Sequence, residues 1–356
     1  MTQEMQKIDP LTTTRFFAAL SVVLYHGGRE LGALNYLRMF TAGDIAVGYF
    51  FVLSGFIITL AYYRPANRFN FPGYLLARFS RIYPVYLLSF ALTCLFYIEI
   101  LSKIKLGKVL ANIFLYQAWF PDYAFSFNIA AWSLSVEIFF YLVFPILVML
   151  FKRSSIKTVL WFSFAFWAVS QIVHATLLVQ YMPEQTIWLF SFPPFHLNSF
   201  LLGAAGGVWY LGRSPIQREN QDTNRAILVT SLGFAFLFIT LREYAPFFPG
   251  GFSLDAGLLA PVFLLIILAL ALDRTSLSQR LSHPRLVLLG DASYALFILH
   301  LPLLWLFRRL LSVVGDPLSY NAMFLIHVVN SIIISILVFK YVERPARDWL
   351  RKIFAC

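Results

Sequence analysis

The chain has 356 residues, of which 60% are hydrophobic and 13% are charged, and its mean hydropathy is +0.73. A water-soluble domain carries about 25% charged residues, so this composition predicts a protein that crosses a membrane several times. The net charge of +11 does not indicate nucleic-acid binding, because the basic residues lie in short gaps between apolar segments, as in cytoplasmic loops. The two cysteines, Cys94 and Cys356, indicate neither a disulfide framework nor a metal site.

Ten apolar segments are long enough to cross a bilayer, since a spanning helix needs about 20 mostly apolar residues and about 17 are tolerated. They are 12–28, 44–63, 82–100, 133–151, 158–180, 187–211, 226–241, 255–272, 286–306 and 322–341. A shorter apolar segment, 109–120, is predicted to form a re-entrant or interfacial helix. The sequence therefore predicts an all-α integral membrane protein that forms a single domain over residues 1–356.

The distribution of basic residues predicts the orientation of these helices. With ten spans and both termini in the cytoplasm, the inner segments contain more than twice as many Lys and Arg residues as the outer segments. Acidic residues divide almost evenly, as the positive-inside rule permits. Counting 109–120 as a span would reverse every later loop and remove the asymmetry. Lys7 precedes the first segment without a cleavage site, as in an uncleaved signal anchor.

The first apolar segment carries two ionisable residues, Arg15 and His26. An ionisable side chain within hydrocarbon is costly unless it is paired, so each is a functional candidate. Eleven helical steps place His26 about 16 Å beyond Arg15 along the axis. In the predicted topology His26, Glu137 and His300 lie at similar depth on three different helices, in the outer half of the membrane. Three groups capable of proton transfer are thus expected near one another.

These residues also have structural explanations. His26, Glu137 and His300 can serve only to hydrogen-bond a neighbouring helix, and Arg15 can extend to the inner surface or pair with Asp291. The remaining histidines are interpreted as structural; they are His174, His196, His283 and His327.

Arg78 and Arg81 are three residues apart, so on a helix they share a face, where two guanidinium groups suit a phosphate-bearing ligand. The alternative is that they are only topological charges of an inner loop. Pro84 is expected to open the third span.

The segment 43–59 (GDIAVGYFFVLSGFIIT) contains Gly43, Gly48 and Gly55, together with Ser54. Small residues in this pattern permit close helix approach or a narrow substrate passage, and close packing is the commoner explanation.

Six segments, taken in order, resemble the acyltransferase-3 family of integral-membrane O-acyltransferases from the first span to the last. They are Arg15–FFAALSVVLY–His26, GYFFVLSGFIIT (48–59), ARFSRIYPVY (77–86), WSLSVEIFFYLVFP (132–145), SYALFILHLPL (293–303) and VERP (342–345). The chain departs from the family pattern in two places. Thr12, Thr13 and Thr14 stand where many members have Asp-Gly-Leu, and Ile138 stands where a second Glu is common.

The resemblance implies transfer of an acyl group, usually acetyl, from cytoplasmic acyl-coenzyme A to a hydroxyl of a cell-surface or exported glycan or glycolipid. It implies a bacterial cytoplasmic (inner) membrane, acyl-coenzyme A as co-substrate and no permanently bound cofactor. Arg15 and His26 match the family's Arg–ten residues–His motif, and Arg78 and Arg81 match its Arg-x-x-Arg motif, which is associated with the coenzyme A phosphates. The expected form is the one without the C-terminal esterase-like domain of some members.

His26 is predicted to be the base that removes the acceptor's hydroxyl proton, or a nucleophile that carries the acyl group, with Glu137 orienting it. Arg15, His300 and Ser54 are predicted to support catalysis. The alternative function is a secondary transporter or flippase of a glycan or lipid. Such a protein is expected to show internal repeats with paired broken helices, which we do not detect.

Overall fold

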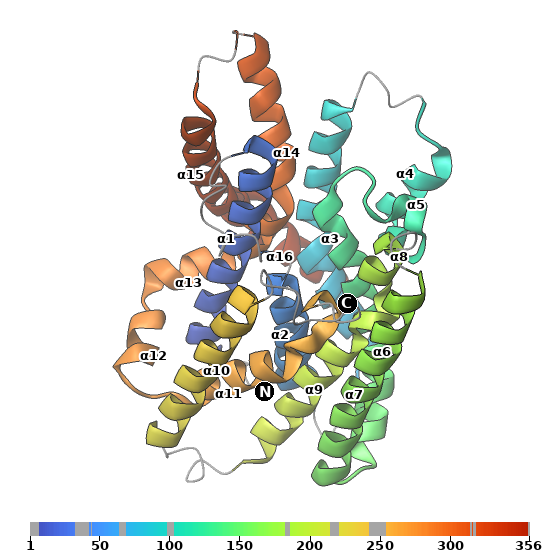
Figure 1. The fold of residues 1–356 in the computed structure, drawn as a ribbon, viewed down its shortest axis with the longest axis vertical. Coiled ribbons are helices and arrows are strands. Elements are labelled where there is room, and N and C mark those ends of the chain that lie inside the picture. Colours follow the sequence, from blue (N-terminus) through green and yellow to red (C-terminus); the bar gives the residue numbers. More distant parts are fainter. Residues whose placement is uncertain are drawn as a thin grey trace.

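The computed structural model describes residues 7–32, 43, 45–63, 69–97, 103–181, 186–213, 221–241, 254–313, 315 and 318–354. Over these residues every regular element is a helix (Figure 1). Seven helices are long and apolar enough to cross a membrane: Ile45–Tyr62, Phe71–Phe96, Ile129–Lys152, Ile156–Tyr181, Gln221–Thr240, Ser293–Val313 and Tyr320–Ile353. The prediction of an all-α membrane protein is therefore confirmed.

The helices follow one another as α1 (Asp9–Leu31), α2 (Ile45–Tyr62), α3 (Phe71–Phe96), α4 (Leu106–Ile113), η3 (Gln117–Trp119), α5 (Pro121–Ala124), η4 (Ile129–Ala131), α6 (Trp132–Lys152), α7 (Ile156–Tyr181), α8 (Thr186–Ser191), η5 (Pro193–His196), α9 (Leu197–Gly212), α10 (Gln221–Leu241), η8 (Leu254–Leu258), α11 (Ala260–Leu272), α12 (Ser276–Leu281), α13 (Pro284–Asp291), α14 (Ser293–Val313), α15 (Tyr320–Val338), η9 (Phe339–Glu343) and α16 (Arg344–Phe354). The elements η8 and η9 are π-helical turns.

The predicted number of ten spans is not confirmed, because three predicted segments differ from the seven long apolar helices. Segment 12–28 forms α1, which is long enough to span but contains Arg15 and several threonines. Segment 187–211 is divided at Pro193 into α8, η5 and α9. Segment 255–272 begins with the turn η8, where Gly257 has a φ of 87°, and only α11 continues as a regular helix. The cytoplasmic location of both termini stays a prediction.

Two predicted helix starts are wrong. α3 begins at Phe71, so Pro84 lies in the interior of the helix rather than in its first turn. The predicted segment 286–306 is divided at Ala292, which ends α13 and precedes α14. The short segment 109–120 forms α4 and η3, neither of which is long enough to span, as predicted.

Glycines bring α2 and α9 into backbone contact. A Cβ added at Gly55 of α2 would collide with the backbone of Phe200, and one added at Gly203 of α9 would collide with the carbonyl oxygen of Val52. The close-packing interpretation of the glycine pattern is confirmed at Gly55. At Gly48 a Cβ would only touch Phe263 at 3.6 Å, so that glycine is not required for space.

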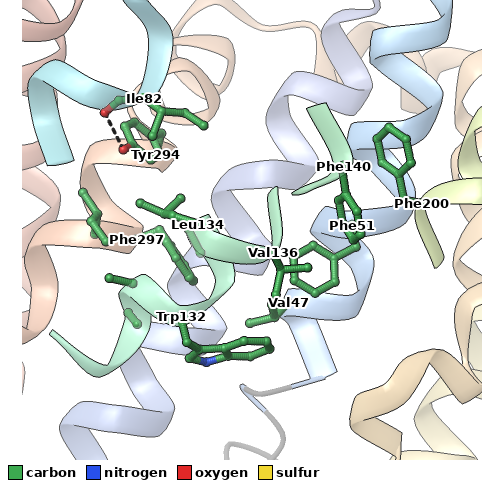
Figure 2. Packing of buried hydrophobic residues seen from close by; sticks show 14 of the residues in the cluster. Val47, Phe51, Ile82, Trp132, Leu134, Val136, Phe140, Phe200, Tyr294 and Phe297 are labelled. Carbon is green, nitrogen blue, oxygen red and sulfur yellow. Dashed lines mark hydrogen bonds between the residues drawn. The ribbon is translucent and has the colours of Figure 1, made fainter. Parts of the chain in front are cut away.

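The apolar core places α6 between α2 and α14. Figure 2 shows Trp132, Leu134, Val136 and Phe140 of α6, with Phe51 of α2 on one side and α14 on the other. The Tyr294 hydroxyl of α14 donates a hydrogen bond of 2.7 Å to the carbonyl oxygen of Ile82 and so ties α14 to α3. α1 lies beside α13, α14 and α15 (Figure 1).

Candidate active site

A cavity of about 510 Å³ lies among α1, α2, α3, α6, α14 and the C-terminal helices η9 and α16. This volume is within the usual range of about 300–1,000 Å³ for small-molecule sites. Its charged lining residues are six basic ones and three acidic ones: Lys7, Arg15, Arg78, Arg81, Arg347 and Arg351, and Glu137, Asp291 and Glu343. The excess of positive charge favours an anionic ligand.

Arg78 and Arg81 both face this cavity from α3, which confirms that they share a helix face. Arg78 Nη2 donates a hydrogen bond of 3.3 Å to the Tyr62 hydroxyl, and its guanidinium carbon lies 5.2 Å from the centre of the Tyr62 ring. Arg78 Nε is buried and has no hydrogen-bond partner. A tyrosine rather than a carboxylate therefore holds Arg78, and its positive charge stays available to a ligand.

Arg15 reaches the same cavity from α1. The alternative pairing of Arg15 with Asp291 is not observed, because Asp291 forms its ion pair with Lys7 at 2.9 Å. Within the described part of the chain, no ion pair involves Arg15, Arg78 or Arg81. The cavity thus contains three arginines without a paired carboxylate.

The C-terminal helices contribute residues that the sequence analysis missed. The π-helical turn η9 ends at Glu343, whose side chain is buried and lines the cavity, and whose Oε2 has no hydrogen-bond partner. Arg347 and Arg351 line it from α16, one helical turn apart. Glu343 lies within the VERP segment (342–345), and the four-residue spacing of Arg347 and Arg351 indicates a shared helix face, but the sequence alone assigns no site role to these three residues.

Glu137 forms its hydrogen bonds inside the cavity. Its Oε1 accepts a bond of 3.2 Å from the Ser54 hydroxyl of α2 and one of 2.7 Å from the Tyr141 hydroxyl of α6. Ser54 and Glu137, predicted independently, are therefore in contact. Tyr141, the third residue of this hydrogen-bonded group, was not predicted.

His26 and His300 form a direct pair, as their predicted similar depth suggested. His26 Nδ1 lies 3.0 Å from His300 Nε2, and the two rings are stacked with centres 5.1 Å apart. The orienting role of Glu137 toward His26 stays a prediction. Among the described residues no hydrogen bond is seen between the two: Glu137 bonds Ser54 and Tyr141, and His26 bonds His300. The reason is that α6 presents Glu137 to α2, whereas α14 presents His300 to α1.

Neither histidine lines the cavity, which ends at aromatic side chains. Phe297 lines it and precedes His300 by one helical turn, and its ring lies 5.8 Å from that of Phe50 in a T-shaped arrangement. At the opposite end the Lys7 side chain is 46% exposed and Arg351 is exposed. The cavity therefore has an exposed basic end, defined by Lys7 and Arg351, and an aromatic end, defined by Phe50 and Phe297. The aromatic end lies beside the histidine pair, because the Phe297 and His300 ring centres are 6.4 Å apart.

The other histidines hydrogen-bond backbone or neighbouring groups. His174 Nε2 contacts the Leu189 carbonyl oxygen at 3.1 Å, and His196 Nε2 contacts that of Phe190 at 2.8 Å. His283 Nδ1 accepts from the Arg285 amide at the start of α13. His327 lies 3.4 Å from the Ser331 hydroxyl. These contacts agree with structural roles.

The fold defines a polytopic membrane protein, and its cavity has a mainly basic charged lining. Residues 10–340 match the acyltransferase-3 family, described as an acyltransferase domain. The chain belongs to this family, and it is an O-acyltransferase.

The relatives include the acyltransferase MdmB of Streptomyces mycarofaciens, which is 26% identical over 90% of this chain and 84% of its own length. The peptidoglycan O-acetyltransferase OatA of Listeria monocytogenes is 26% identical over 94% of this chain, and the O-acetyltransferase OatA of Staphylococcus aureus is 24% identical over 96% of it. The chain matches only 54% and 57% of the lengths of these two proteins. No solved structure matches the chain.

Proposed function

We propose that the protein transfers an acyl group, acetyl in the first instance, from acyl-coenzyme A to a hydroxyl of a cell-surface or exported glycan or glycolipid. The observation that carries this proposal is the cavity with three unpaired arginines, whose aromatic end lies beside the histidine pair. The similarity to enzymes named O-acetyltransferase and peptidoglycan O-acetyltransferase supports acetyl as the group and a glycan as the acceptor.

The basic end suits the phosphates of the donor. Guanidinium groups bind phosphate oxygens through short, charge-assisted and often bidentate hydrogen bonds. Arg78 and Arg81 supply two such groups from one face of α3, and Arg15 supplies a third from α1. The exposed Arg351 adds positive charge at the entrance, where it attracts a polyanion from the aqueous side, whereas Lys7 is paired there with Asp291.

The middle of the cavity suits the narrow, amide-containing arm of the donor. Glu137, Ser54 and Tyr141 form a hydrogen-bonded group there, and the Glu137 carboxylate retains capacity to accept bonds. In this proposal Glu137 accepts a hydrogen bond from an amide N–H of the arm. It acts on the donor and not on His26.

The chemical step belongs to His26. Its neutral imidazole removes the acceptor's hydroxyl proton while that oxygen attacks the thioester carbonyl, and the C–S bond then breaks. The coenzyme A thiolate leaves and takes up the proton, so the enzyme ends unchanged. An acyl-histidine would carry the same group in two steps. Phe50 and Phe297 line the cavity with their ring centres 5.8 Å apart, and neither histidine lines it, so in this proposal these rings separate to let the thioester reach His26.

The predicted topology places the basic end at the cytoplasmic face of a bacterial inner membrane. The larger number of Lys and Arg residues in the inner segments supports this orientation. The donor then enters from the cytoplasm, and the acceptor approaches His26 from the other side.

The test compares surface glycans and lipids by mass spectrometry in cells with and without the gene. We expect the deletion to remove the mass of one acetyl group per acceptor site. The wild-type gene and the His283→Ala control restore it, and His26→Ala does not. An unchanged mass profile in the deletion strain refutes the proposed function. Full restoration by His26→Ala refutes only the role of the base.

A further inference from the structure

The hydrogen bonds of His300 determine which of its nitrogens carries the proton. Its Nδ1 lies 2.7 Å from the carbonyl oxygen of Phe297, which precedes it by one turn of α14. A carbonyl oxygen can only accept, so Nδ1 of His300 must be the donor. The backbone thereby determines that Nδ1 of His300 carries a proton.

The protonation state of the second nitrogen of His300, Nε2, follows from the burial of the side chain. The side chain has an exposed fraction of 0%, and within the part of the chain that the structure describes its ionisable neighbours are the imidazoles of His26 and His327. A cation in this position would be desolvated and surrounded by further imidazoles instead of a carboxylate, which is costly. His300 is therefore neutral, and with its proton on Nδ1 its Nε2 holds a lone pair.

The 3.0 Å contact between His300 Nε2 and His26 Nδ1 then has one consistent direction. Because His300 Nε2 accepts, His26 Nδ1 must donate. In a neutral imidazole only one nitrogen carries a proton, so Nε2 of His26 is the basic nitrogen.

We infer that His300 is a positioning residue that holds His26 as the Nδ1–H tautomer and so directs Nε2 of His26 toward the acceptor's hydroxyl proton. The inference rests on the proposed function for its catalytic meaning, but the tautomer itself is independent of it. When Nε2 takes the hydroxyl proton, the Nδ1–H of His26 still donates to His300, and this bond stabilises the imidazolium until the proton passes to the coenzyme A thiolate.

The first test observes the tautomer directly. The wild-type protein is labelled with ¹⁵N-histidine, reconstituted in lipid and studied by solid-state NMR, and the signals of His26 and His300 are identified by their loss in single variants. We expect both imidazoles to be protonated at Nδ1 and bare at Nε2. A His26 protonated at Nε2 overturns the inference, whatever the enzyme's activity.

The second test separates positioning from packing. His300→Gln retains a side-chain oxygen that can accept from His26 Nδ1, whereas His300→Leu fills a similar volume without an acceptor. Isolated membranes that contain the endogenous acceptor are supplied with labelled acetyl-coenzyme A, and rates are normalised to the amount of inserted protein. We expect the Leu variant to lose about tenfold or more in maximal rate, part of the roughly 10²–10⁴-fold that a general base contributes, with an unchanged KM for acetyl-coenzyme A. The Gln variant keeps most of the rate.

Equal rates for the two variants, or a wild-type rate for His300→Leu, overturn the positioning role. If neither variant accumulates in the membrane, the NMR measurement on the wild-type protein decides. If the wild-type membranes transfer no acetyl group, the proposed function fails, and the NMR result still tests the tautomer by itself.

Discussion

Replacing Arg78 and Arg81 together with glutamine removes two positive charges from one face of α3. Each guanidinium is expected to form at least one charge-assisted hydrogen bond with a donor phosphate, and such bonds contribute about 1.5–3 kcal/mol each. Both side chains are half-buried, and Arg78 Nε already lacks a partner. The lower end of the range is appropriate, because four other basic residues still line the cavity.

Two bonds at the lower end give about 3 kcal/mol, which corresponds to roughly 10²-fold in the dissociation constant of the donor. The assay is equilibrium binding of coenzyme A to the purified protein in lipid nanodiscs, with pantetheine as a ligand that lacks the phosphates. The double variant should weaken coenzyme A binding by this factor and leave pantetheine binding nearly unchanged. Arg285→Gln, which removes a positive charge from an exposed position outside the cavity, is the matched control. A double variant that binds coenzyme A as tightly as this control refutes the phosphate role.

Three further predictions concern the aromatic end of the cavity, Glu137 and the contact between α2 and α9. Phe50→Trp enlarges the aromatic closure, so it should lower the maximal rate of acetyl transfer while coenzyme A binding in nanodiscs stays unchanged; an unaltered rate argues against passage between Phe50 and Phe297. Glu137→Gln should raise the KM for acetyl-coenzyme A more than it lowers the maximal rate in isolated membranes, and the reverse pattern would restore the prediction that Glu137 orients His26. Gly203→Ala places a methyl group against the Val52 carbonyl oxygen and should destabilise the protein by about 1–3 kcal/mol in a thermal-unfolding assay, whereas Gly233→Ala, which meets nothing, should not. Equal melting temperatures for these two variants would contradict the account of the α2–α9 contact.

The sequence was informative where a side chain's chemistry conflicts with its surroundings. Arg15 and His26 were found because ionisable residues are rare within hydrocarbon, and the structure places both beside functional candidates. The spacing of Arg78 and Arg81 correctly predicted a common face, since helical periodicity depends only on local geometry.

The incorrect predictions concern features that tertiary packing determines, namely where a helix is interrupted and which side chains are in contact. Apolar composition cannot show that a helix is interrupted at Pro193, at Gly257 or at Ala292, because the residues on both sides are equally apolar. Glu137 and His300 were expected at the same depth in the membrane, so depth alone could not show which of them contacts His26. The rotation of α6 and α14 about their axes decides this, and it brings His300 to His26 and Glu137 to Ser54. Glu343 was missed because its burial depends on the π-helical turn η9, which its local sequence did not reveal.

Because α1 is a continuous helix, the positions of Arg15 and His26 are mechanically coupled. Its only proline, Pro10, lies in the first turn, so Arg15 and His26 are carried by one regular helix. Their separation along its axis is therefore constant at about 16 Å. Any tilt or translation that an anion imposes on the guanidinium must displace the imidazole as well. In the proposed function, donor binding at Arg15 is thus transmitted to His26 through a single backbone segment.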